Sequence, residues 1–133
     1  MKILVDTYIW SLALRRNNDT EIETVQLLKN LILDQKIQMI GPIRQELLSG
    51  IKSENPFNSL KSYLSAFPDL PIQTQDYELA AEHFNINKTK GIQGSNTDFL
   101  ICALSHNYEM PILTKNKDFE HHAKYLPVLI YHT

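Results

Sequence analysis

The stretch that decides the fold of this chain is Ile3-Leu4-Val5-Asp6, at residues 3–6. Three consecutive apolar residues, two of them β-branched, are typical of a short strand that is buried on both faces, as strands of parallel sheets are. The apolar run stops at the carboxylate of Asp6. Because ligands bind beyond the carboxyl ends of parallel strands, Asp6 is the first place where we expect chemistry.

Working outward, apolar strand patterns alternate with helical patterns along the rest of the chain. The further strands are expected over residues 36–40, 111–113 and 128–130, and helices are expected to begin near residues 7, 20, 42, 55, 74, 98 and 118. This order predicts an α/β fold in which a parallel β-sheet is flanked by helices on both faces, an α/β/α sandwich. No repeat or linker interrupts it, so residues 1–133 are expected to form one domain.

Several helix starts carry local signals. Thr20 and Glu23 have the spacing of a capping box, and Pro42 suits the first turn of a helix. Thr97 is expected to cap a helix over residues 98–106, which is apolar nearly all round and therefore buried. The expected inward residues are Ile22, Val25, Leu28, Leu31 and Ile32 in the second helix, and Leu60, Tyr63 and Leu64 in the fourth.

Composition narrows the class of protein. The chain has 133 residues and a net charge of −2, so it does not resemble a strongly basic nucleic-acid binder. It has no long apolar run, and the apolar stretch before Asp6 is too short for a signal peptide, so we expect neither a membrane span nor secretion. Cys102 is the only cysteine, which excludes an internal disulfide. We therefore expect a cytoplasmic protein.

Acidic residues fall where this topology predicts a site. Asp6 follows the first strand, Glu46 lies early in the helix after the second, Asp98 begins the buried helix, and Asp118 follows the 111–113 strand. Converging carboxylates repel one another and must take up protons or bind a cation, for which Mg²⁺ or Mn²⁺ is suited. The expected reaction is phosphodiester hydrolysis by a metal-activated water, which Glu46 or Asp118 could orient.

Each acid also has an ordinary structural interpretation. Asp6 and Asp98 could cap or complement a helix start, Glu46 could be an exposed helix residue, and Asp118 could begin a helix. The joint pattern favours a site more strongly than any single residue does. Basic residues that could surround it and contact phosphates, or simply be solvated, are Arg15, Arg16, Arg44, Lys88, Lys90, Lys115 and Lys117.

With these residues in view, the sequence resembles the PIN-domain ribonucleases, in particular the VapC-type toxins of toxin–antitoxin systems. The resemblance covers essentially the whole chain, and its motifs occur in the family's order. They are Ile3-Leu4-Val5-Asp6-Thr7, Arg44-Gln45-Glu46-Leu47, Thr97-Asp98-Phe99-Leu100-Ile101-Cys102-Ala103 and Ile112-Leu113-Thr114-Lys115-Asn116-Lys117-Asp118-Phe119.

The resemblance implies a Mg²⁺ or Mn²⁺ site that uses Asp6, Glu46 and Asp98. Many members carry a fourth acid where this chain has Asn116, so either the Asn116 carbonyl or Asp118 could take that place. Three small polar residues match family positions that support the metal-binding side chains or contact a phosphate: Thr7, Thr97 and Thr114.

It also implies an endoribonuclease that cuts structured RNA, often a tRNA, and that forms a homodimer silenced by a cognate antitoxin. A catalytically inactive PIN-like module for RNA binding or regulation is the alternative. An aspartate-based phosphatase is disfavoured because Tyr8 stands where its second Asp would be.

Other chemistry-bearing residues are expected to be structural. His121 and His122 are neighbours in a helix and point about 100° apart, so they are expected at the surface and not as joint metal ligands. Cys102 and Trp10 are expected in the core, Trp10 with a dimer interface as the other possibility, and His83 and His106 have no partner spacing.

Overall fold

The computed structural model describes residues 1–14 and 22–131. At its centre, β1 (Ile3–Val5) pairs in parallel with β2 (Ile37–Gln38) on one side and with β3 (Ile112–Leu113) on the other. The order β2-β1-β3 puts the fully buried β1 in the middle of the sheet. The predicted parallel sheet is confirmed, and its strands are shorter than the sequence pattern suggested.

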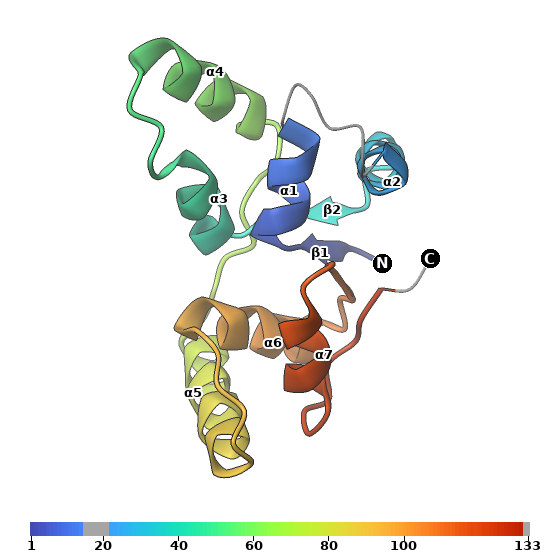
Figure 1. Ribbon diagram of the computed structural model, residues 1–133, viewed down its shortest axis with the longest axis vertical. Helices are drawn as coiled ribbons and strands as arrows, with labels where there is room; N and C mark the ends of the chain where they lie inside the picture. Colours follow the sequence, from blue (N-terminus) through green and yellow to red (C-terminus); the bar gives the residue numbers. More distant parts are fainter. Residues whose placement is uncertain (15–21, 132–133) are drawn as a thin grey trace.

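Helices cover both faces of the sheet. In Figure 1 the strands lie between α1–α4 on one side and α5–α7 on the other, which confirms the predicted layering. Among these helices, none combines the length and hydropathy needed to cross a membrane. The helices in the described part of the chain are α1 (Thr7–Leu14), α2 (Ile22–Leu33), α3 (Gly41–Leu48), α4 (Glu54–Leu64), α5 (Thr74–Thr89), α6 (Asn96–Tyr108) and α7 (Lys117–Ala123).

Helix α6 is the central helix, as its apolar sequence predicted. Every side chain from Phe99 to Ser105 is buried. It packs along α5 on one side and contacts α7 on another. A helix that is enclosed in this way holds its first turn, and therefore Asp98, in a fixed position relative to the sheet.

The start of α6 corrects one expectation. Its N-cap is Ser95 rather than Thr97, since the Ser95 hydroxyl oxygen accepts a hydrogen bond from the Asp98 N–H at 3.0 Å. The helix begins at Asn96, so Thr97 lies already within the first turn. Both residue types are good caps, and the sequence did not distinguish them.

Three further expectations were wrong or fall outside the described residues. Residues 128–130 do not form a strand, because only an isolated bridge joins Ile130 to Ile112. Ile22 and Tyr63 are 62% and 48% exposed, although their spacing placed them on inward faces. The capping-box residue Thr20 lies outside the described residues, as do Arg15 and Arg16.

Candidate active site

Asp6 lies at the carboxyl end of β1 and is only 5% exposed. One carboxyl oxygen, Oδ1, accepts a hydrogen bond from the Ile9 N–H at 2.9 Å and so caps α1. The other, Oδ2, accepts a hydrogen bond from the Thr114 hydroxyl at the end of β3. The capping role and a position at the predicted site therefore coexist in one residue.

Thr114 connects Asp6 to the start of α7. Its Oγ1, which donates to Asp6, accepts a hydrogen bond from the Asn116 N–H at 3.0 Å. The Asn116 side-chain oxygen in turn accepts the Asp118 N–H at 3.0 Å and is the N-cap of α7. Asn116 and Asp118 thus form the turn that holds Thr114, and neither is joined by a hydrogen bond or ion pair to Asp6, Glu46 or Asp98 within the described residues.

Glu46 reaches the site through Thr7. It lies on an exposed face of α3, and its Oε2 accepts a hydrogen bond from the Thr7 hydroxyl. Thr7 directly follows Asp6 and begins α1. Glu46 is therefore linked to the β1–α1 junction through the residue next to Asp6, and its convergence with the Asp6 and Asp98 carboxylates stays a prediction.

Asp98 lies in the first turn of α6, with 26% of its side chain exposed. Burial raises the pKa of Asp6, and the negative charge of Asp98 raises it further, while hydrogen bonds from Thr114 and Ile9 act in the opposite direction. The structure thus brings Asp6 and Asp98 close enough to repel one another. A cation between them would relieve that repulsion.

His122 is the residue that the sequence interpretation placed wrongly. It is completely buried, and its Nε2 lies 3.4 Å from Oδ2 of Asp98, whereas its neighbour His121 is exposed as expected. One signal could have found it. Phe119 and His122 are three residues apart in α7, so both lie on the face of the helix that packs against the core.

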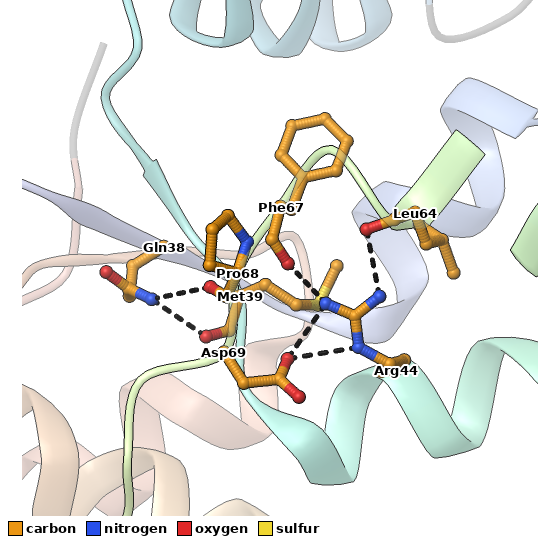
Figure 2. A network of polar contacts seen from close by, with 7 residues as sticks. All are labelled: Gln38, Met39, Arg44, Leu64, Phe67, Pro68 and Asp69. Atoms are coloured by element: carbon orange, nitrogen blue, oxygen red, sulfur yellow. Dashed lines mark hydrogen bonds and ion pairs between the residues drawn. The ribbon is translucent and has the colours of Figure 1, made fainter. Parts of the chain in front are cut away.

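Arg44 was expected near the cleft as a phosphate contact, and the structure gives it another role (Figure 2). Its guanidinium donates to the backbone oxygens of Leu64 (2.8 Å) and Phe67, and it forms an ion pair with Asp69 at 2.9 Å. These contacts fasten α3 to the end of α4 and to the segment that follows it. Arg44 is therefore engaged by protein groups and is a structural clamp.

The other predicted basic residues lie at the surface. Lys115 and Lys117 are exposed on either side of Asn116, next to the turn that holds Thr114. Lys88 and Lys90 are exposed at the end of α5, where the Lys90 ammonium lies 5.3 Å from the centre of the Tyr125 ring. Lys115 and Lys117 are the two that adjoin the carboxylates.

The carboxylates fit a magnesium or manganese ion that binds few protein ligands and keeps several waters. In the described residues, no three His, Cys, Asp or Glu side chains are arranged to enclose a metal ion. Mg²⁺ does not require such a cage, because it usually keeps several waters and binds one or two carboxylates together with substrate phosphates. The Asp6 and Asp98 pair, with Glu46 joined to it through Thr7, supplies hard oxygen ligands of that kind.

Cys102, Trp10, His83 and His106 were expected to be structural residues, and their surroundings agree with that expectation. Cys102 is buried, and burial raises the pKa of its thiol to about 12. Trp10 lies in the core with its ring edge-on to Phe67 at 5.1 Å between centres. His83 stacks on the exposed His106 at 5.6 Å. None of these four side chains therefore offers Asp6 a neighbouring nucleophile or metal ligand.

Comparison with known proteins identifies the family and the fold. The model of the PIN domain family matches residues 3–125. The chain is similar to FitAcB from Neisseria gonorrhoeae, at 22% identity and a TM-score of 0.78, over 98% of this chain and 96% of that one. No curated protein sequence matches significantly.

Two further solved structures are similar to this chain. One is VapBC2 from Rickettsia felis bound to a DNA fragment from their promoter, at 21% identity and a TM-score of 0.76, over 98% of this chain and 96% of that one. The other is FitAB bound to an IR36 DNA fragment, at 22% identity and a TM-score of 0.77, over 97% and 93%. At such identities the likeness establishes a common fold.

Proposed function

The chain belongs to the PIN-domain family, and on that premise we propose that it is a Mg²⁺- or Mn²⁺-dependent endoribonuclease, the toxin of a type II toxin–antitoxin pair. PIN domains are in general nucleases, so the proposal specifies the metal, the substrate and the partner. The observation that carries it is the electrostatic repulsion between Asp6, at the carboxyl end of the central strand, and Asp98, in the first turn of α6, which are far apart in sequence.

Each carboxylate has a distinct place in this proposal. Asp6 and Asp98 hold the metal, and Thr114 fixes the rotation of Asp6 through its hydroxyl. When bound, the ion lowers the pKa of a water and neutralises charge on a phosphate oxygen. Glu46 is exposed and accepts a hydrogen bond from Thr7, and in this proposal it orients that water and accepts its proton.

The fourth acidic position is assigned between Asn116 and Asp118 by their contacts. Asn116 uses its side-chain oxygen to cap α7, so it supports the turn that holds Thr114. Asp118 is exposed in the first turn of α7 and lines a hollow with Gln93 and His122. We therefore propose that Asp118 supplies the fourth charge and that Asn116 positions Thr114. Cleavage that is retained in Asp118→Asn and increased in Asn116→Asp would reverse this assignment.

RNA is the proposed substrate because of the family resemblance, with tRNA as the first substrate to test. The polyanion would lie against Lys115 and Lys117, whose charges contact phosphates without selecting a base sequence. Thr7 and Thr97 lie in the first turns of α1 and α6, each next in sequence to one of the carboxylates, Asp6 and Asp98. They are proposed as groups that contact the metal's waters or a phosphate.

An antitoxin and a second copy of the chain are the proposed partners. The solved relatives are protein complexes bound to DNA fragments, and a partner of this chain would do the DNA binding. A carboxylate cluster with little metal is a receptor for arginine, so an arginine-bearing segment of the antitoxin could occupy it. Co-expression with any small reading frame that lies directly upstream tests the antitoxin, and light scattering of the purified chain tests the second copy.

The deciding experiment is RNA cleavage by matched carboxamide variants. Asp6→Asn and Asp98→Asn are expected to abolish Mg²⁺- or Mn²⁺-dependent cleavage of total tRNA, while single-stranded DNA stays uncut. Asp34→Asn is the control, because Asp34 is exposed ahead of β2 and so lies at the opposite edge of the sheet. Cleavage that survives in both variants would refute the mechanism.

A thermal melt with and without Mn²⁺ distinguishes this proposal from the alternative, a catalytically inactive PIN-like module. An active site should gain stability from Mn²⁺ by mass action, at about 2.7 kcal/mol for a concentration one hundred times the Kd. A wild-type protein that binds RNA, gains no stability from Mn²⁺ and cuts neither RNA nor DNA would be the binding module instead.

A further inference from the structure

His122 is buried next to Asp98 of the candidate site. Its side chain has no exposed surface, and its ring packs against Phe99 at 4.8 Å and Phe119 at 5.7 Å between centres. Its backbone oxygen accepts a hydrogen bond from the Asn87 side-chain amide at 3.2 Å. The imidazole thus packs between the rings of Phe99 in α6 and Phe119 in its own helix, α7, while its backbone is bonded to α5.

Among the described residues, the polar group that the imidazole contacts is the Asp98 carboxylate. Nε2 of His122 lies 3.4 Å from Oδ2 of Asp98, while Nδ1 has no hydrogen-bond partner in the described part of the chain. A proton on Nδ1 would be a buried donor with no acceptor, which is costly. The ring is therefore assigned as the Nε2–H tautomer, whose single N–H donates to Asp98.

Gly94 makes room for this arrangement. A Cβ added at Gly94 would lie 2.6 Å from Cε1 and 2.7 Å from Nε2 of His122, and 3.0 Å from the Phe99 ring. Gly94 has no unusual φ, so the need for glycine here is one of space alone. Any larger residue would displace the edge of the imidazole that faces Asp98.

We propose that His122 is a positioning residue, whose Nε2–H fixes the orientation of the Asp98 carboxylate so that the other oxygen faces the site. The inference rests on the proposed function, because it concerns the same carboxylate. Asp98 is partly exposed at a helix start, and a carboxylate there would otherwise rotate freely. Hydrogen bonds to metal-binding carboxylates typically change metal affinity by about 10–100-fold.

The test measures the Mn²⁺ concentration that gives half of the maximal rise in melting temperature, without reference to catalysis. His122→Asn removes the donor from the Nε2 position, since the Asn amide reaches only as far as Nδ1. His122→Gln restores a donor near Nε2. The matched control is His121→Asn, because His121 is the exposed neighbour on the same helix. Gly94→Ala displaces the ring without changing any polar group.

The expected results separate positioning from packing. His122→Asn and Gly94→Ala are expected to raise the half-saturating Mn²⁺ concentration by about tenfold or more. His122→Gln is expected to recover most of the affinity, and His121→Asn to match the wild type. A purely structural His122 would lower the melting temperature without Mn²⁺ in all three core variants and leave the half-saturating concentration unchanged, which overturns the inference.

The same measurement distinguishes failure of the proposed function. If the wild-type protein gains no stability from Mn²⁺, and Asp98→Asn behaves like it, the metal site itself is refuted and this inference falls with it. A different result refutes only the positioning role. In that case Mn²⁺ raises the melting temperature of the wild type but not of Asp98→Asn, and folded His122→Asn or Gly94→Ala has the same half-saturating Mn²⁺ concentration as the wild type.

Discussion

The hydroxyl of Thr114 donates a hydrogen bond to Oδ2 of Asp6, although 108 positions separate the two residues in the chain. The bond joins the ends of β3 and β1, which are adjacent parallel strands. Because Asp6 is buried, this hydroxyl partly replaces the water that the carboxylate has lost. The strand pairing and the geometry of the site are therefore coupled through one side-chain contact.

Replacing Thr114 tests that coupling. Thr114→Val keeps the shape and removes the donor, so a buried carboxylate oxygen loses its partner at a cost of about 1–3 kcal/mol. The loss also raises the pKa of Asp6, since the Thr114 hydrogen bond lowers it. Urea unfolding measures the stability. Thr114→Ser retains the hydroxyl and should stay within about 0.5 kcal/mol of the wild type. Equal losses in both variants would contradict the prediction.

Arg44 should prove to be a clamp. Arg44→Lys keeps the charge but cannot donate to Leu64, Phe67 and Asp69 together, and we expect it to cost about 2–3 kcal/mol in urea unfolding. Asp69→Asn is the companion variant. Its exposed ion pair should contribute less than about 1 kcal/mol, so most of the loss comes from the two carbonyls. Unchanged stability in Arg44→Lys, together with weaker RNA binding, would show that Arg44 contacts the substrate instead.

Charge reversal at Lys115 and Lys117 should weaken RNA binding. Each lost phosphate contact is expected to lower the slope of log Kd against log salt by about 0.7–0.9. Filter binding of tRNA at several salt concentrations measures that slope. Lys36→Glu is the control, because Lys36 is exposed ahead of β2 at the opposite edge of the sheet. An unaltered slope in the double variant would exclude these lysines from the RNA contact.

Cys102 should be inert in the folded protein. With the pKa of its thiol at about 12, the thiolate fraction at pH 8 is about one part in ten thousand, and the side chain is buried as well. A colorimetric thiol reagent at pH 8 is expected to modify it only as fast as the protein unfolds, and at once in denaturant. Rapid modification under native conditions would show that the interior around α6 opens readily.

Glu109 offers a stabilising substitution. It caps the end of α6 in the left-handed region, with φ 52° and ψ 46°, where a side chain costs about 1 kcal/mol relative to glycine. Glu109→Gly is therefore expected to stabilise the protein by about 1 kcal/mol in thermal melts. Glu109→Ala keeps the Cβ and should give no such gain. Cleavage should be unaffected, because Glu109 lies at the far end of α6 from Asp98.

The wrong predictions share a physical cause. Tyr63 and Ile22 have the spacing of inward residues, but burial depends on what covers each side chain, and within the described residues these two are 48% and 62% exposed. His122 was expected at the surface with His121 because neighbours in a helix point about 100° apart and cannot easily share a metal ion, yet His122 packs into the core on the same face of α7 as Phe119. Arg44 stands beside Glu46 in sequence, and only the return of the chain after α4 supplies the carbonyls that bind it.

By itself, the sequence determined the buried central strand, the parallel α/β/α order and the enclosed α6, because these follow from local apolar patterns and short-range signals. It also marked Asp6, Glu46 and Asp98, since Asp6 follows a strand, Asp98 begins a helix and Glu46 lies in the helix after the second strand. Only the tertiary structure decided which side chains meet: Thr114 with Asp6, Thr7 with Glu46, and His122 with Asp98. Such contacts join residues distant in the chain, and they exist only once the strands have paired and the helices have packed.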